Sequence, residues 1–219
     1  MKKFIFRINV VALILSLSLL SGCTTRTNTN EKGNVSSAAS ISKPLEQALL
    51  LPDDQLVEKY ATEVDISLGD DLLFSDSKDI PSQTLFEFFC HITSNKENSK
   101  NNEYAENYQQ KWYDPKDNQF HVPVAEVTGI LNKYFDGINF DPKKISGYDS
   151  KTNEIIKAIL SGFGGARFPK LVNKEISSND TLKLTVDFCD PEYKTILYTK
   201  IYTIRFDDNG YQYLSIAKK

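Results

Sequence analysis

The spacing of apolar residues changes once along the chain, and this change constrains the fold more than any other feature. Before about residue 144, apolar side chains recur at helical intervals; from about Ile145 they alternate with polar ones, as in half-buried strands. Helices followed by sequential hairpins are typical of an α+β fold with an antiparallel sheet covered on one side. We therefore expect N-terminal helices packed on a C-terminal antiparallel meander sheet of about four to six strands.

The clearest helical pattern lies in VPVAEVTGILNKYFDG, residues 122–137. Val124, Val127 and Leu131 recur at helical spacing, and Gly137 suits a C-terminal stop. Weaker patterns predict helices over residues 44–50, 53–64, 80–93 and 104–113.

Turn residues divide the alternating segments into hairpins. Asn209-Gly210 is a strong hairpin signal, because a type I′ turn needs positive φ at both central residues. This turn joins predicted strands at 195–206 and 211–217, and a polar turn joins 168–176 to 181–188. Shorter hairpins are predicted within 113–120 and 146–160, and no internal repeat is apparent in the sequence.

The N-terminus has the pattern of an export signal. Met1 to Arg7 carries three basic residues, and an apolar stretch over 8–20 follows, which is shorter than a membrane-spanning helix requires. It ends in Leu20-Ser21-Gly22-Cys23. Residues 24–43 are mostly Ser, Thr, Asn and Gly, and they predict a flexible tether.

The Leu-Ser-Gly-Cys sequence resembles the lipobox of bacterial lipoproteins. This resemblance implies cleavage after Gly22, a diacylglycerol on Cys23, and a location on the extracytoplasmic face of the cell membrane. The whole chain resembles small cell-surface lipoproteins of unknown function from Gram-positive bacteria, through the lipobox, the tether, the 122–137 helix and the GYDSKTN hairpin. The order of its elements is similar to that of NTF2-like domains and compatible with cystatin-like packing.

These segments divide the chain into a signal peptide (1–22), a lipidated tether (23–43) and one α+β domain (44–219). The domain is mainly helical over 44–112, with a helix and antiparallel sheet over 113–219. After removal of the signal, 23 basic residues stand against 29 acidic ones. A mildly acidic domain without a basic stripe argues against a nucleic-acid partner.

Three aromatic residues supply the candidate binding surface. Tyr104, Tyr108 and Trp112 recur every four residues, so on a helix they form one row. Such a row either packs on the sheet or stacks on a cell-wall glycan or another envelope protein. Both interpretations stay open at the level of the sequence.

The remaining reactive residues form no recognisable motif. His91 and His121 lack the spacing of known metal sites, and Cys90 and Cys189 are expected to be free thiols. The glycines of SGFGGARFP favour a bend or bulge over a phosphate cradle, and the acidic residues near Asp70 lack the alternation of a calcium loop. We therefore expect no catalytic, cofactor or metal site.

The sequence thus predicts a membrane-anchored, non-enzymatic binding or interaction module of the cell envelope. The alternative is an envelope hydrolase or other small-ligand enzyme, with a site assembled from scattered residues in an NTF2-like pocket.

Overall fold

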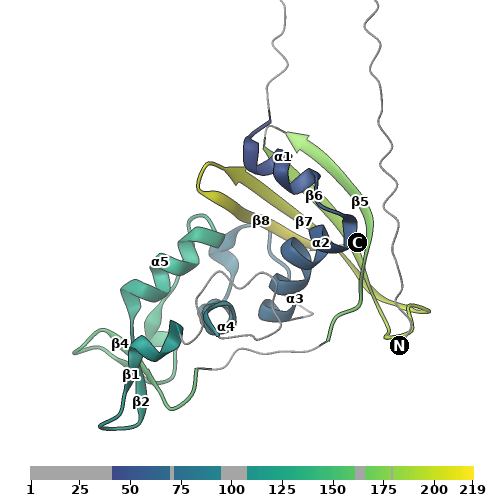
Figure 1. Cartoon of the computed structure of the whole chain (residues 1–219). Helices are drawn as coiled ribbons and strands as arrows, with labels where there is room; N and C mark the ends of the chain where they lie inside the picture. The colour runs from purple at the N-terminus through teal and green to yellow at the C-terminus, as the bar shows by residue number, and fades with distance from the viewer. Residues whose placement is uncertain (1–40, 70–71, 95–107, 161–165, 179) are drawn as a thin grey trace, which may run out of the picture. The chain divides into compact units, whose positions relative to one another are not determined.

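The computed structural model describes residues 41–69, 72–94, 108–160, 166–178 and 180–219 (Figure 1). Helices α1 to α5 alternate with short π- and 3-10 segments, η1 to η4, and eight strands are described. The helical elements are α1 (Lys43–Leu49), α2 (Asp53–Val57), η1 (Glu58–Thr62), α3 (Glu63–Leu68), η2 (Ser77–Asp79), α4 (Ser82–Thr93), η3 (Tyr108–Trp112), α5 (Val124–Tyr134) and η4 (Pro142–Lys144). The strands are β1 (Tyr113–Asp114), β2 (Gln119–Pro123), β3 (Tyr148–Asp149), β4 (Glu154–Lys157), β5 (Pro169–Ser178), β6 (Thr181–Cys189), β7 (Ile196–Asp207) and β8 (Gly210–Lys218).

Most predicted helices are confirmed. The segment Asp53–Leu68 is helical throughout, with one π-helical stretch, η1, between α2 and α3, and it ends at Gly69, whose φ is 86°. The helix predicted over 104–113 differs from the structure in its described part. Tyr108–Trp112 is 3-10 rather than α-helical, and Tyr113 begins β1.

The C-terminal half forms the predicted antiparallel meander. Its four strands pair in the order β5-β6-β7-β8 (Figure 1). Alternation places Leu184, Tyr202 and Tyr213 on the buried face of this sheet. Helix α1 contacts β7, α2 contacts β5, and α5 contacts β8. Apolar side chains from the helices and from both sheets join in one continuous core. The predicted α+β fold is therefore confirmed.

Strands β1 to β4 form a second four-stranded sheet, whereas a single sheet was predicted. Its order is β1-β2-β4-β3, so two hairpins that α5 separates in the chain meet through the antiparallel pair of β2 and β4. The sequence shows each hairpin but not which strand of one meets the other.

The two hairpins share one turn, which corrects the expectation that the chain has no repeat. Both read Tyr-Asp-X-Lys-X-Asn, and the Asn at the end of each turn, Asn118 or Asn153, has a φ near 60°. In each, the tyrosine hydroxyl donates to the side chain of that Asn. The strand registers also match, since Tyr113 faces Phe120 as Tyr148 faces Ile155.

Within the described part of the chain, none of the helices has the length and apolar character needed to cross a lipid bilayer.

Candidate functional site

Several residues singled out from the sequence lie outside the described residues. These are the predicted lipid-bearing Cys23, the first member of the aromatic row, Tyr104, the glycines at 162, 164 and 165, and Asp70 and Asp71.

The other two members of the aromatic row pack against the protein itself. Trp112 is only 5% exposed, and its ring lies 5.3 Å from that of Phe89 on α4 and 5.5 Å from that of Tyr108. The ammonium of Lys111 lies over both the Tyr108 and Trp112 rings, and it also bonds to Glu126 at 3.0 Å. Burial thus favours the packing interpretation for Trp112, while Tyr108 is half-buried.

Both described cysteines are free, as expected, and both are buried. Burial raises the pKa of the Cys90 thiol to about 12, so this thiol stays protonated and poorly nucleophilic at neutral pH.

A buried charge cluster around Asp65 on α3 was not predicted from the sequence. The Asp65 carboxylate is fully buried and accepts hydrogen bonds from four side chains. The donors are Lys200 Nζ at 2.7 Å, Tyr198 OH at 2.8 Å, Arg167 Nε at 2.9 Å and Tyr202 OH at 3.0 Å. A signal was present, because alternation in β7 places Lys200 on the same face as Tyr202 and Ile204.

This cluster joins α3 to the sheet rather than facing a ligand. The Lys200 side chain is 2% exposed and also donates to the Gly69 carbonyl, at 3.2 Å, just where α3 ends. Burial, together with the negative charge of Asp65, raises the pKa of Tyr202 well above its ordinary value, so its hydroxyl remains a donor. The arrangement satisfies a buried carboxylate and fixes the position of α3.

His91 also faces inward. Its Nε2 lies 3.4 Å from a carboxylate oxygen of Glu63, and the histidine side chain is 4% exposed. His91 is therefore a core histidine with a carboxylate partner.

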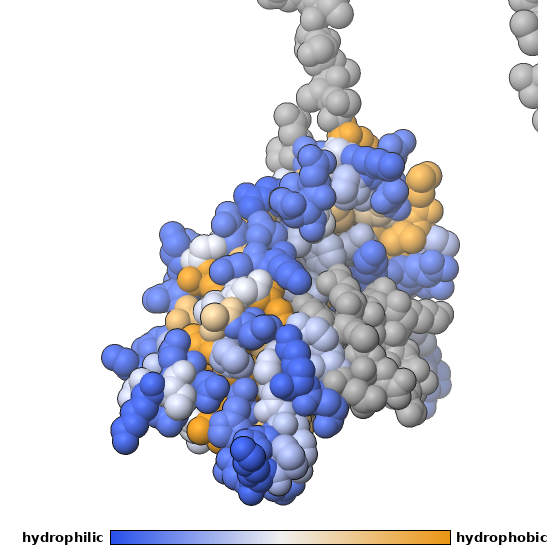
Figure 2. Space-filling view, turned by 60° about the vertical axis from the view of Figure 1, so that its left-hand side comes forward, coloured by the Kyte–Doolittle hydropathy of each residue, from blue (hydrophilic) through white to orange (hydrophobic). Residues whose placement is uncertain are grey.

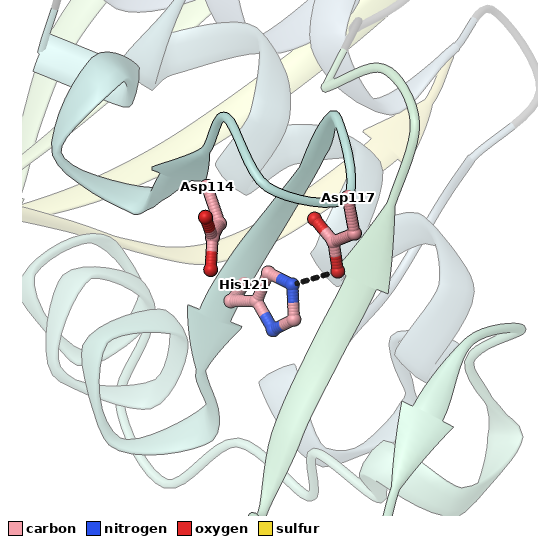
Figure 3. A group of neighbouring side chains, drawn as sticks. All are labelled: Asp114, Asp117 and His121. Carbon is pink, nitrogen blue, oxygen red and sulfur yellow. Dashed lines mark hydrogen bonds and ion pairs between the residues drawn. The ribbon is translucent and has the colours of Figure 1, made fainter.

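His121 has a different environment, on the β1–β2 hairpin (Figure 3). Its Nε2 lies 2.8 Å from Asp117 Oδ2, its Nδ1 lies 3.5 Å from Glu154 Oε2, and its side chain is 27% exposed. The hydrogen bond that His121 donates to Asp117, with a smaller contribution from Glu154, raises the pKa of His121 above its ordinary value. The Asp114 carboxylate lies on the other side of the ring, so the hairpin gathers carboxylates and an imidazole at an accessible surface.

Two hollows in the described part of the surface share Tyr211 in their lining. The larger, of about 300 Å³, is lined by polar residues of α5 and the β7–β8 turn, including Asn132, Lys133 and Asn209. The smaller, of about 260 Å³, lies between α1 and Tyr60, Phe206 and Tyr211. Neither brings a histidine together with a carboxylate.

Large apolar side chains are exposed at separate places. Figure 2 shows a mostly hydrophilic face on which hydrophobic residues form scattered patches. Three of them lie close together in the sequence: Tyr193 in the β6–β7 connection, and Ile196 and Leu197 at the start of β7, which are 57%, 57% and 62% exposed. We call these three residues the β6–β7 tip.

No protein-family model matches the chain, and no curated protein or solved structure shows significant similarity to it.

Proposed function

We propose that the protein is a lipoprotein, held on the extracytoplasmic face of the cell membrane by a lipid on Cys23, and that it acts there as a non-enzymatic interaction module. The proposed lipid anchor is supported by the sequence Leu20-Ser21-Gly22-Cys23, which ends a short apolar stretch that follows a basic N-terminus. Each buried methylene adds about 0.8 kcal/mol of membrane affinity, and stable anchoring takes two chains. A diacylglycerol supplies both.

The tether and the other cysteines are compatible with this proposal. A flexible segment of about twenty residues spans on the order of 25 Å, which holds the domain clear of the lipid surface. Cys90 and Cys189 are buried, so neither competes with Cys23 for an acyl donor.

Protein recognition is supported by the β6–β7 tip. Exposed apolar and aromatic side chains supply the central contacts of many interfaces. The partner we propose is another envelope protein; a cell-wall glycan that stacks on Tyr104 and Tyr108 is the other candidate.

The hydrolase alternative finds less support. A general base must reach its substrate. His91 is almost fully buried, and His121, although 27% exposed, lines neither of the two hollows. An enzyme with an NTF2-like pocket remains the competing proposal.

The anchor is tested by Cys23→Ala in the native host, followed by cell fractionation. We expect the variant to leave the membrane fraction, since it lacks the acylated thiol. A matched Ser21→Ala variant keeps a small residue before the cysteine and should remain membrane-bound. Retention of Cys23→Ala in membranes would refute the lipid anchor.

The interaction is tested by a photo-crosslinking residue at position 197, compared with one at Asn209. Asn209 lies in the turn at the opposite end of β7. We expect one discrete crosslinked envelope protein from position 197 only, and its loss with Tyr193→Ser. Equal labelling from both positions, or none, would contradict a role for the tip.

A further inference from the structure

The β1–β2 hairpin brings together three side chains of the kinds that bind metal ions. Asp114, Asp117 and His121 each offer one ligand atom, and these atoms all lie within 4.8 Å of one another. Figure 3 shows the imidazole of His121 between the two carboxylates, with a contact to Asp117. The side chains of Asp117 and His121 are 40% and 27% exposed, so an ion reaches them from solvent.

The backbone of the turn holds both carboxylates in place. The Lys116 amide donates to Asp114 Oδ1 at 2.9 Å, and the Gln119 amide donates to Asp117 Oδ1 at 3.1 Å. Each aspartate therefore keeps its second oxygen for another partner. Zinc ligands lie about 2.0–2.2 Å from the ion, which places tetrahedral ligand atoms about 3.3 Å apart. His121 Nε2 and Asp117 Oδ2 lie 2.8 Å apart, and no two of the three ligand atoms are more than 4.8 Å apart, so side-chain rotations are enough to bring all three to one ion.

The second nitrogen of His121 faces a carboxylate from a neighbouring strand. Glu154 on β4 lies 3.5 Å from Nδ1, on the side away from Asp117. Histidines that bind metals usually donate their other ring N–H to a carboxylate or carbonyl, which fixes the tautomer and strengthens the ligand. Glu154 is placed to act in this way.

The second hairpin shows that the turn alone does not require this cluster. It has the same Tyr-Asp-X-Lys-X-Asn turn, and Lys151 N donates to Asp149 Oδ1 at 2.8 Å as Lys116 does to Asp114. Yet it carries Thr152 where the first hairpin has Asp117, and Ile156 where it has His121. The fold thus forms the same turn without these two side chains, and their presence in one hairpin calls for another explanation.

We propose that the β1–β2 hairpin binds one divalent transition-metal ion, best matched by Zn²⁺, through Asp114, Asp117 and His121. Imidazole nitrogen favours zinc and its neighbours over Mg²⁺ and Ca²⁺, and the two carboxylates balance the charge of the ion. Three protein ligands leave one tetrahedral position for water or for a donor group from a partner. The sequence predicted no metal site because the spacing matches no familiar motif; the hairpin register brings these ligands together.

The test is calorimetric titration of Zn²⁺ into the full chain, purified in neutral detergent and first stripped with a chelator. We expect one zinc per chain. His121→Ile and Asp117→Thr, each copied from the second hairpin, should weaken binding at least tenfold. Asp149→Asn, which changes the equivalent turn aspartate, should bind as the wild type does.

Nitrogen NMR of the imidazoles supplies an independent readout, since the chain has two histidines. Zinc should shift Nε2 of His121 and leave His91 unchanged, which supports the site even if a variant misfolds by circular dichroism. The proposal is overturned if the wild type binds no stoichiometric zinc, if the signals of His121 do not respond, or if folded variants keep full affinity. Displacement of zinc by equimolar Ca²⁺ would also overturn the assignment to a transition metal.

Discussion

The buried Asp65 cluster allows a sharp test of what holds α3 against the sheet. In Asp65→Asn the side chain keeps its shape but loses its charge, so Lys200 and Arg167 lose their buried counter-ion. Four side-chain donors also face an amide that accepts through one oxygen only. Removal of one partner from a buried ion pair costs about 3–5 kcal/mol. Domains of this size are stable by about 5–15 kcal/mol, so we expect a large part of the stability to be lost.

A matched control separates burial from ion pairing as such. Asp53 pairs with Lys174 at 2.8 Å, close to the 2.7 Å between Asp65 and Lys200, but its side chain is 65% exposed rather than fully buried. Surface pairs contribute about 0–1 kcal/mol. Asp53→Asn should therefore change the free energy of unfolding several-fold less than Asp65→Asn.

The assay is urea unfolding of the chain from Thr24, followed by fluorescence of the sole tryptophan, Trp112, which is buried in the native state. A loss below about 1 kcal/mol in Asp65→Asn, on the scale of an exposed pair, would refute the reasoning. The double variant Asp65→Asn, Lys200→Met tests the same reasoning, because it also removes the buried Lys200 charge that Asp65→Asn leaves without its counter-ion. It should be more stable than Asp65→Asn alone.

Three further predictions follow from local geometry. Cys90 should react with a thiol reagent at neutral pH only as fast as the native state opens, because burial raises its pKa to about 12; rapid native labelling would contradict this burial. Gly147→Ala should lower the free energy of unfolding in urea by about 1–3 kcal/mol, since φ is +83° and a Cβ would lie 2.2 Å from a backbone oxygen. In the control Gly129→Ala, in α5, the new Cβ meets nothing within 4 Å, so the free energy of unfolding should stay the same or rise. In metal-free protein, NMR titration should show a pKa of His121 above its ordinary value, and this pKa should fall in Asp117→Thr. Because the native partners favour the imidazolium, they stabilise the fold below the ordinary pKa of histidine, and this stabilisation is lost as the pH rises through the raised pKa of His121. An unchanged pKa in that variant would contradict the contact.

Local elements could be read from the sequence because their determinants lie within a few residues. The spacing of Val127 and Leu131 predicts α5, and Asn209-Gly210 predicts the β7–β8 turn. The β1–β2 turn was also recognised, yet the grouping of Asp114, Asp117 and His121 was not, since the approach of Asp114 to His121 depends on the direction in which the turn orients each side chain.

Tertiary structure decided the features that join distant segments. Asp65 lies more than 100 positions from each of its four partners, so no window of the sequence contains the cluster, although the place of Lys200 on an apolar strand face hinted at it. The pairing of β2 with β4 likewise joins two hairpins that α5 separates in the chain, and local sequence does not determine which of their strand edges meet. Periodicity and turn chemistry depend on residues that are neighbours in the sequence, so they can be recognised there. The partner of a buried charge depends on which side chains lie close to it in the folded core, and only the tertiary structure determines this.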